Sequence, residues 1–331
     1  MKKLLVLSPF SPAQMARIRE AAGDCSVLQL PEDASEKAIA EAMVGADVVI
    51  GEPSQAAIAA SGTVQWVQMT WAGTDKYTRS PIPFPAGVTL TNATGVFGDI
   101  ISQYLIGMTL SLMQNFPGYL AQQQAHIWQD LGPVHTLEGA TVLIFGAGDI
   151  GGHAARRLKA FGTYNIGVCR HTDRPRPGFD CLCSLSDAQQ WLPKADVVLC
   201  CIPNSAETTH YLNASRLGSM KQTAVLVNAG RGNFIDCAAL AEYLQSGHLL
   251  GAALDVTDPE PLPPDHPLWE IPNCLLTPHV AGITFGHLTQ TSDRMCALAC
   301  DNLRRWRQGL PLRGMVLPKD TENSSVSMKA L

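Results

Sequence analysis

An apolar five-residue run leads directly into three closely spaced glycines near the middle of the chain. Residues 141–145 read Thr-Val-Leu-Ile-Phe, and residues 146–151 read Gly-Ala-Gly-Asp-Ile-Gly. The segment that follows has apolar residues spaced to share one face of a helix, namely Ile150, Ala154, Leu158 and Phe161. A strand that turns through G-x-G-x-x-G into a helix is typical of a dinucleotide-binding fold. The sequence therefore predicts a parallel α/β domain with a nucleotide site at this turn.

Each residue of the turn has a separate expected role. Gly146 permits the tight turn, Gly148 lets the backbone approach a pyrophosphate, and Gly151 lets the helix pack closely on the strand. The helix N-terminus, at Asp149 and Ile150, faces the anion. A purely structural glycine turn is the alternative interpretation, and the apolar strand and helix on either side argue against it.

Further short apolar runs alternate with helical patterns on both sides of the turn. In the N-terminal part, the expected strands are 3–7, 25–30, 47–50, 64–69 and 88–91, and the expected helices are 12–22 and 35–44. After the turn, the expected strands are 164–169, 196–202, 224–228, 251–256 and 274–277, and a last helix is expected at 284–307. Strands that alternate with helices form parallel sheets covered on both faces. We therefore expect an α/β protein with doubly wound parallel sheets.

The bulk composition is that of a folded protein with more than one domain. The chain has 331 residues, which exceeds the size at which a single core stops growing. Hydrophobic residues make up 46%, and the net charge of −5 with no basic block argues against a nucleic-acid partner. The apolar run after Lys3 is interrupted at Ser8 and Pro9, which favours a buried strand over a secretion signal. The apolar stretch 96–113 carries Asp99 and Gln103, so we expect a buried helix and no membrane span.

Ten cysteines without a secretion signal indicate a reducing, cytoplasmic compartment. No two of them form a C-x-x-C pair. Cys200 and Cys201 lie in an apolar strand, where cysteine acts as a small hydrophobic residue. We therefore expect no metal site.

The end of the second strand of this domain, which is the first strand after the glycine turn, sets the expected choice of cofactor. A ribose-binding Asp or Glu would stand there in an NAD enzyme, but the sequence places Arg170 and His171 at this point. A guanidinium suits a 2′-phosphate, and Arg174 and Arg176 follow closely. The sequence therefore favours NADP(H). NAD(H) stays open as the alternative, in which Asp173 reaches the ribose and Arg170 is a solvated surface charge.

Polar residues that suit reduction of a 2-oxo acid follow three later strands. Arg231 follows one strand, Asp255 and Glu260 follow the next, and His279 follows the third. In an open parallel sheet the carboxyl ends of the strands line the ligand crevice, so these residues are expected to converge. A guanidinium can hold the substrate carboxylate and polarise its ketone, while an imidazolium protonates the ketone oxygen. A carboxylate orients that imidazolium, and Asp255 could accept from the nicotinamide carboxamide.

Taken singly, each of these residues has a structural interpretation. An arginine after a strand is usually a surface charge, a lone histidine is more often structural than catalytic, and Glu260 lies between two prolines. Their joint placement at three strand ends, downstream of a nucleotide turn, favours the catalytic interpretation.

Several segments together resemble the D-isomer-specific 2-hydroxyacid dehydrogenase family. They are GAGDIG, VLVNAGRG, GAALDV with DPEP, DHPLWEIPNCLLTPHVAG, and TNATGVFGDIISQYLIG. The resemblance implies Arg231, Glu260 and His279 as the catalytic set. It also implies a flavodoxin-like substrate domain of residues 1–95 plus 284–331 and a Rossmann cofactor domain of residues 96–283.

The same resemblance implies binding residues in both domains. Residues 71–75 match the family's carboxylate-binding loop, where the backbone N–H groups of Ala72, Gly73 and Thr74 grip the substrate beside Arg231 and His279. The implied cofactor contacts beyond the glycine turn are Arg170, His171, Cys201, Ile202, Pro203, Ala229, Asp255 and Gly282.

The choice of substrate is less constrained than the reaction. Arg170 and the DHPLW stretch make the chain most similar to glyoxylate/hydroxypyruvate reductases, and Glu260 speaks against the formate dehydrogenase branch. The bulky Trp71 and the presence of Gln103 in place of a frequent Glu depart from the common pattern. An NAD-dependent D-lactate-like or phosphonate/phosphite-type dehydrogenase is one alternative, and a dinucleotide-sensing co-repressor-like protein is another. The resemblance and the apolar 96–113 helix also predict a homodimer, while the tail from Leu317 onward is polar and unpatterned.

Overall fold

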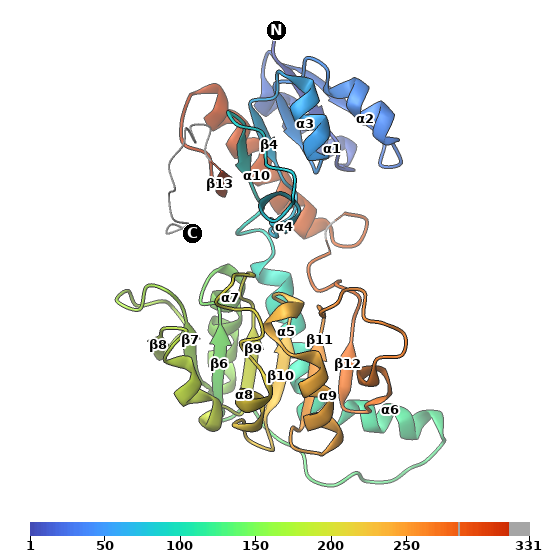
Figure 1. Cartoon of the computed structure of the whole chain (residues 1–331), viewed down its shortest axis with the longest axis vertical. Coiled ribbons are helices and arrows are strands. Elements are labelled where there is room, and N and C mark those ends of the chain that lie inside the picture. Colours follow the sequence, from blue (N-terminus) through green and yellow to red (C-terminus); the bar gives the residue numbers. More distant parts are fainter. Residues whose placement is uncertain (284, 318–331) are drawn as a thin grey trace. The chain divides into compact units, whose positions relative to one another are not determined.

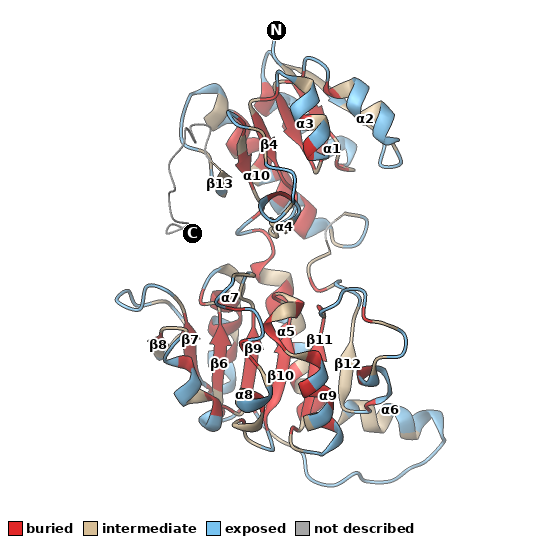
Figure 2. Ribbon diagram, in the orientation of Figure 1, coloured by how far each residue is buried: buried red, intermediate tan, exposed pale blue. Residues whose placement is uncertain are grey.

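The computed structural model describes residues 1–283 and 285–317, which divide into two compact units (Figure 1). Unit 1 combines Met1–Phe97 with the segment from Ile283 onward, and unit 2 is Gly98–Gly282. The backbone thus leaves unit 1 once, builds all of unit 2, and returns. Each unit has its own sheet, whose strands are largely buried (Figure 2).

Unit 1 contains a six-stranded sheet with the strand order β13-β5-β4-β3-β1-β2. The strands are β1 (Lys3–Val6), β2 (Ser26–Gln29), β3 (Val48–Ile50), β4 (Trp66–Gln68), β5 (Thr89–Thr91) and β13 (Met315–Leu317). The first five strands are parallel, and their order 2-1-3-4-5 is that of flavodoxin. A fully buried row of Leu5, Val49, Val67 and Leu90 crosses the sheet in register, which explains the apolar runs in the sequence.

The helices of unit 1 are α1 (Pro12–Ala22), α2 (Glu36–Met43), α3 (Gln55–Ser61), α4 (Asp75–Thr78) and α10 (Thr289–Arg307). Helix α1 starts where the sequence predicts, with Ser11 and Gln14 forming a capping box. Helix α10 packs against α1, which joins the two ends of the chain in one core. It starts at Thr289, later than the sequence predicts, because Gly286 has a left-handed φ of 75° that interrupts a helix.

Unit 2 contains a seven-stranded, all-parallel sheet with the order β12-β11-β10-β9-β6-β7-β8. The strands are β6 (Thr141–Phe145), β7 (Tyr164–Val168), β8 (Cys181–Cys183), β9 (Val197–Cys200), β10 (Val225–Asn228), β11 (Gly251–Leu254) and β12 (Cys274–Leu276). Numbered within the unit, this is the 3-2-1-4-5-6 order of a Rossmann fold with one more strand. The predicted fold class of two parallel-sheet α/β domains is confirmed.

Five α-helices connect or cover these strands: α5 (Gly98–Met113), α6 (Phe116–Gln124), α7 (Asp149–Leu158), α8 (Ala214–Gly218) and α9 (Cys237–Gln245). Helix α5 packs on α7, β10 and β11, and its Asp99 pairs with Arg157 of α7. The predicted apolar face of α7 does not extend to Phe161, which is 41% exposed because residues 159–161 form a separate 3-10 turn.

Three further observations concern the sequence expectations on compartment, metal and membrane. All ten cysteines are free thiols. Within residues 1–283 and 285–317, no three His, Cys, Asp or Glu side chains lie together as a metal site. In the same part of the chain, no helix combines the length and apolarity needed to span a bilayer. The predicted tail lies outside the described residues from 318 onward, whereas Leu317 itself belongs to β13.

Candidate active site

The glycine turn between β6 and α7 has the geometry that its sequence predicts. Gly146 has a φ of 100°, and a Cβ there would lie 2.8 Å from the Cys201 carbonyl oxygen. A Cβ on Gly151 would overlap the Gly146 carbonyl oxygen, so only glycine lets α7 start this close to the strand end. A Cβ on Gly148 would meet no described atom within 4 Å, which leaves that face of the turn open. The turn therefore fits a pyrophosphate at the α7 N-terminus.

The side chains at the start of α7 serve packing within the unit. The Asp149 carboxylate accepts from the Gly98 N–H at 2.9 Å and lies 3.6 Å from His153 Nε2. Burial lowers the pKa of His153, which keeps this imidazole neutral near pH 7. Ile150 is half-buried. An anion at the N-terminus of α7 would therefore be bound by the backbone N–H groups of Asp149 and Ile150, and not by their side chains.

Basic residues follow β7 near the same turn. Arg170 and His171 are exposed. Arg176 folds back onto the glycine turn, where its Nη1 donates to the Ala147 carbonyl oxygen at 2.7 Å, and its buried Nε has no partner among the described residues. Asp173 and Arg174 form an exposed pair 3.9 Å apart. The segment after β7 thus brings a guanidinium group, that of Arg176, to the glycine turn.

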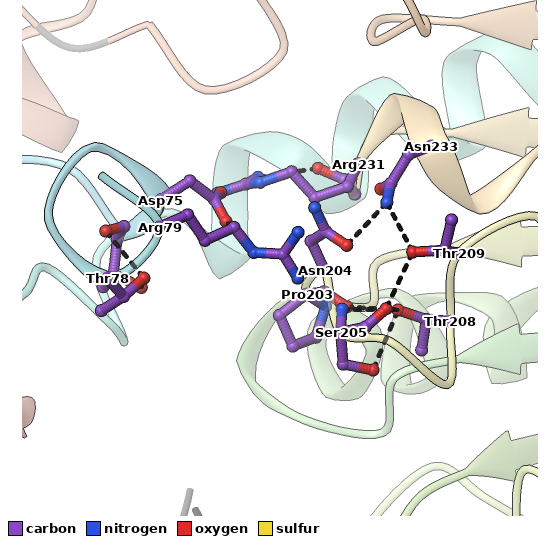
Figure 3. A network of polar contacts seen from close by, with 12 residues as sticks. Asp75, Thr78, Arg79, Pro203, Asn204, Ser205, Thr208, Thr209, Arg231 and Asn233 are labelled. Carbon is purple, nitrogen blue, oxygen red and sulfur yellow. Dashed lines mark hydrogen bonds and ion pairs between the residues drawn. The ribbon is translucent and has the colours of Figure 1, made fainter. Parts of the chain in front are cut away.

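The loop after β9 lies beside the loop after β10. A Cβ on Gly230 would lie 2.9 Å from both backbone N and O of Ile202, so the two loops are in direct contact. Cys201 donates from its N–H to Phe145 at 2.8 Å, and Ala229 donates to Cys200 at 3.1 Å, which fixes both loops to the sheet. Pro203 then leads into a polar segment (Figure 3).

Side-chain amides and hydroxyls that no sequence pattern had indicated hold this polar segment in place (Figure 3). Asn233 Nδ2 donates to Asn204 Oδ1 at 2.6 Å and to Thr209 Oγ1 at 3.1 Å. The Ser205 N–H donates to Thr208 Oγ1 at 2.8 Å. Asn233 follows Arg231 by two residues, so the network also supports the arginine-bearing loop.

Arg231 lies in a turn that the fully buried Asn228 shapes. Asn228 Oδ1 accepts from the Gly230 N–H, and its Nδ2 donates to the Arg231 carbonyl oxygen, both at 3.0 Å. A Cβ on Gly232 would overlap the Thr257 carbonyl oxygen, which brings the Arg231 turn against the segment that leads to Glu260. In the sequence, Asn228 could have been recognised as the one polar residue at the end of the apolar strand 225–228.

His279 and Glu260 contact each other directly. His279 Nδ1 lies 2.6 Å from Glu260 Oε1, and the two side chains are 51% and 42% exposed. Because a carboxylate only accepts, this contact assigns a proton to Nδ1 and leaves Nε2 as the other functional nitrogen of the ring. His279 has a φ of 55°, a left-handed conformation that is uncommon outside glycine and is often found at functional sites.

Asp255 builds the loop that carries His279. It is 3% exposed, and its Oδ1 accepts from Thr277 Oγ1 at 2.6 Å and from the Val280 N–H at 2.8 Å. Its Oδ2 accepts from the Ala281 N–H at 2.9 Å, and the His279 N–H donates to the Asp255 carbonyl oxygen at 2.9 Å. The carboxylate thus already accepts three hydrogen bonds within the protein. Contact with a nicotinamide carboxamide stays a prediction for Asp255.

Tyr104 of α5 extends this network by one residue. Its hydroxyl lies 2.7 Å from Thr277 Oγ1, and burial raises the pKa of Tyr104 to about 12. The phenol therefore stays protonated and can act as a donor across the physiological range. The loop that ends at Gly282, the last residue of unit 2, is held from α5, β11 and β12 together.

The predicted carboxylate-binding loop follows β4 in unit 1. Ala93 donates from its N–H to the Trp71 carbonyl oxygen at 2.9 Å, and Asn92 Nδ2 donates to the Ala72 carbonyl oxygen at 2.8 Å. Ala72, Gly73 and Thr74 are half-buried, whereas Trp71 is 52% exposed. With its carbonyl groups engaged in this way, the loop keeps a defined backbone conformation.

Comparison with known proteins decides the family. The family model for the NAD-binding domain of D-isomer specific 2-hydroxyacid dehydrogenases matches residues 106–281, more than half of the chain. The chain belongs to this family. It is an oxidoreductase that uses a nicotinamide dinucleotide and acts as a D-2-hydroxyacid dehydrogenase, as the sequence predicted.

Similar proteins extend the match to nearly the whole dehydrogenase chain. A D-isomer specific 2-hydroxyacid dehydrogenase family protein from Aeromonas salmonicida is 34% identical, with a TM-score of 0.84 over 96% of this chain and 99% of that one. The mouse glyoxylate reductase/hydroxypyruvate reductase is 27% identical over 96% of this chain and 97% of its own length. An NADPH-dependent glyoxylate/hydroxypyruvate reductase from Sinorhizobium meliloti, solved with NADP and sulfate, is 26% identical with a TM-score of 0.79 over 96% and 98%.

Proposed function

We propose that this dehydrogenase is an NADP(H)-dependent reductase of short 2-oxo acids of the glyoxylate/hydroxypyruvate type. The observation that carries the chemistry is the 2.6 Å contact between His279 Nδ1 and Glu260 Oε1, at the carboxyl edge of a nucleotide-binding sheet. The substrate class is supported by the mouse and Sinorhizobium relatives, which carry this activity in their names. The cofactor choice is supported by the arginines after β7 and by the NADP in the Sinorhizobium structure.

The glycine turn would hold the cofactor. The α7 N-terminus and the open face of Gly148 suit its pyrophosphate, and the 201–203 loop suits its adenosine side. Arg170 and Arg176 offer guanidinium groups on the side expected for a 2′-phosphate. When bound, the nicotinamide supplies or accepts a hydride.

The protein residues then divide the remaining work. Glu260 holds Nδ1 of His279, so Nε2 faces away from the carboxylate and can give a proton to the substrate ketone oxygen in reduction or take it back in oxidation. Because Glu260 is a carboxylate, its contact with Nδ1 is a charge-assisted hydrogen bond, which holds the ring more firmly than a neutral acceptor would. Arg231 supplies a fork of N–H donors for the substrate carboxylate and its carbonyl oxygen, and the 72–74 backbone is proposed to bind the same carboxylate.

Arg170 gives a direct test of the cofactor choice. Replacing Arg170 with serine should raise the KM for NADPH by about tenfold, the scale of one charge-assisted hydrogen bond, and leave the KM for NADH unchanged. The exposed Arg304 of α10, in unit 1, is the control, and Arg304→Ser should behave like the wild type. Initial-rate kinetics with both reduced cofactors measure the effect. A wild type with higher kcat/KM for NADH than for NADPH would favour the NAD-dependent alternative.

The substrate class needs its own experiment. A panel of glyoxylate, hydroxypyruvate, pyruvate and phosphite, assayed with both cofactors in the appropriate direction, distinguishes the proposed reductase from D-lactate-like and phosphite-type dehydrogenases. If phosphite or pyruvate gave the highest kcat/KM, the proposed substrate class would be wrong. A co-repressor-like protein would bind dinucleotide and consume none of it with any of these acids.

The homodimer remains a proposal. The feature that supports it is the segment after α5, and not α5 itself. The apolar face of α5 is buried within unit 2, whereas no residue of α6 is buried. Exposed apolar side chains lie on α6, at Phe116 (58%) and Leu120 (56%), and continue just after it, at Ile127 (50%) and Trp128 (102%). Exposed apolar groups gathered in one segment are typical of a protein interface.

We therefore expect the double variant Leu120→Asp with Trp128→Ser to halve the molecular mass in solution, because a buried charge opposes association. Light scattering coupled to size-exclusion chromatography measures this change. Phe161→Asp, which alters an apolar residue of similar exposure (41%) elsewhere in unit 2, should leave the mass unchanged. A monomeric wild type at micromolar concentration would contradict the homodimer.

A further inference from the structure

A carboxylate lies directly behind the predicted substrate loop of unit 1. Glu52 follows β3, and its Oε1 accepts from the Thr70 N–H at 2.6 Å. The Thr70 hydroxyl also lies 3.1 Å from Oε1 and 3.2 Å from Oε2, and Thr70 is 2% exposed. The backbone N–H and the side-chain hydroxyl of Thr70, the residue that precedes the loop, therefore both contact the Glu52 carboxylate.

The same short segment also holds the other end of the loop. Lys76 Nζ donates to the Glu52 carbonyl oxygen at 2.7 Å, and the Tyr77 hydroxyl donates to the Pro53 carbonyl oxygen at 2.7 Å. Gln55 Nε2 donates to the Tyr77 carbonyl oxygen at 3.1 Å. Residues 52–55 thus hold the chain immediately before Trp71 and immediately after Asp75. The 71–75 loop is therefore anchored at both ends by hydrogen bonds to one short segment.

We propose that Glu52 is a positioning residue for the substrate: its carboxylate fixes the Thr70 peptide, and thereby the directions of the N–H groups at residues 72–74. The inference rests on the proposed function, in which these N–H groups bind the substrate carboxylate. A carboxylate suits the task because it only accepts, and so satisfies an amide N–H and a hydroxyl at once. Two donors on one carboxylate hold a peptide plane more firmly than one contact does.

The protonation state of Glu52 should then control the loop. Burial raises the pKa of Glu52, against the hydrogen bonds from Thr70 and the positive charge of Lys76, which lower it. Lys76 and Tyr77 of α4 are the titratable groups that face it, and burial raises the pKa of Tyr77, so its phenol stays protonated. A protonated Glu52 would turn one acceptor into a donor and lose one contact with Thr70.

Ionisation of Glu52 has opposite effects on folding stability and on positioning of the loop. Because the pKa of Glu52 is raised in the folded chain, its stabilising contribution is full at pH values below the ordinary carboxyl pKa and is lost as pH rises through the raised value. The ionised form that positions the loop is therefore the form that costs folding stability. Such a conflict is expected for a residue retained for function and not for packing.

The test compares Glu52→Gln and Glu52→Ala with the wild type in the full chain. Both variants should raise the KM for glyoxylate by about tenfold at pH 8, while kcat and the KM for NADPH stay within about twofold. In the wild type the KM for glyoxylate should rise as the pH is lowered from 8 towards the ordinary carboxyl pKa, because the pKa of Glu52 is raised, and in Glu52→Gln this rise should be absent. Glu41→Gln, on the exposed face of α2, is the matched control and should follow the wild type.

A second readout separates this proposal from the proposed function. Amide hydrogen exchange at residues 70–74 should speed up by about tenfold or more in Glu52→Ala, whatever acid the enzyme reduces. Thermal stability of Glu52→Gln at pH 8 should equal or exceed that of the wild type. Unchanged exchange, or a wild-type KM across the whole pH range in both variants, would overturn the role of Glu52. If the wild type did not reduce glyoxylate, but amide exchange in Glu52→Ala changed as expected, only the proposed substrate class would be wrong.

Discussion

Replacing His279 with alanine should reduce kcat for 2-oxo acid reduction by about 10²- to 10⁴-fold, the usual contribution of a general acid. The reason is local to the site. Glu260 holds His279 Nδ1 at 2.6 Å, and the Asp255 network fixes the backbone on both sides, so the ring is presented in one orientation. An alanine leaves that loop intact because its hydrogen bonds come from the backbone and from Asp255.

The affinity for NADPH should stay within about twofold in this variant, since the acid acts in the transition state and not in cofactor binding. Fluorescence titration of NADPH and steady-state assays measure the two quantities separately. Glu260→Gln should give a smaller loss in kcat, because the amide oxygen can still accept from Nδ1 and orient the ring but lacks the charge that strengthens this hydrogen bond. His135→Ala, which lies before the amino end of β6, is the control. Normal turnover by His279→Ala would refute its role.

Replacing Arg231 with lysine should lower kcat/KM for the 2-oxo acid by about 10²-fold or more, because an ammonium cannot reproduce the planar fork of a guanidinium. The turn that carries Arg231 is rigid: Asn228 fixes it from inside the sheet, and Gly232 packs on Thr257. A side chain with a different reach therefore cannot be accommodated by a shift of the backbone.

Binding of oxamate, a substrate-like 2-oxo acid analogue, provides the equilibrium measurement for Arg231. Its dissociation constant in the presence of NADPH should rise in parallel with the loss of kcat/KM, because the same fork binds both acids. Arg174→Lys, at an exposed position of the same unit, should change neither value. Retained oxamate affinity in Arg231→Lys would show that another group binds the carboxylate.

The prediction of the fold from the sequence succeeded where strands are buried on both faces. Residues 141–145 and 225–228 are near-continuous apolar runs because neighbouring strands and helices cover them completely. The edge strands β8 and β13 were missed, since each has three residues and no apolar run of useful length. Helices α3 and α4 were missed for the same reason of length, although Ser54 caps α3 by accepting from Ala57.

The prediction of the site followed a similar division. The glycine turn and the polar residues after three strands were visible because their spacing is local or follows from sheet geometry. Residues that support them at a distance were not. Thr277 contacts Asp255, 22 residues away, and Tyr104 contacts Thr277, 173 residues away, and such pairs leave no periodic pattern.

By itself, the sequence determined the class of fold, the nucleotide turn and the set of residues suited to the reaction. These depend on short-range rules: side-chain period, glycine conformation and the order of strands. Only the tertiary structure decided which groups meet. It paired His279 with Glu260, committed the Asp255 carboxylate to the loop of His279, and placed Glu52 behind Thr70. The physical reason is that hydrogen bonds and desolvation depend on distances of a few ångströms between chain-distant atoms, which packing of the whole unit sets.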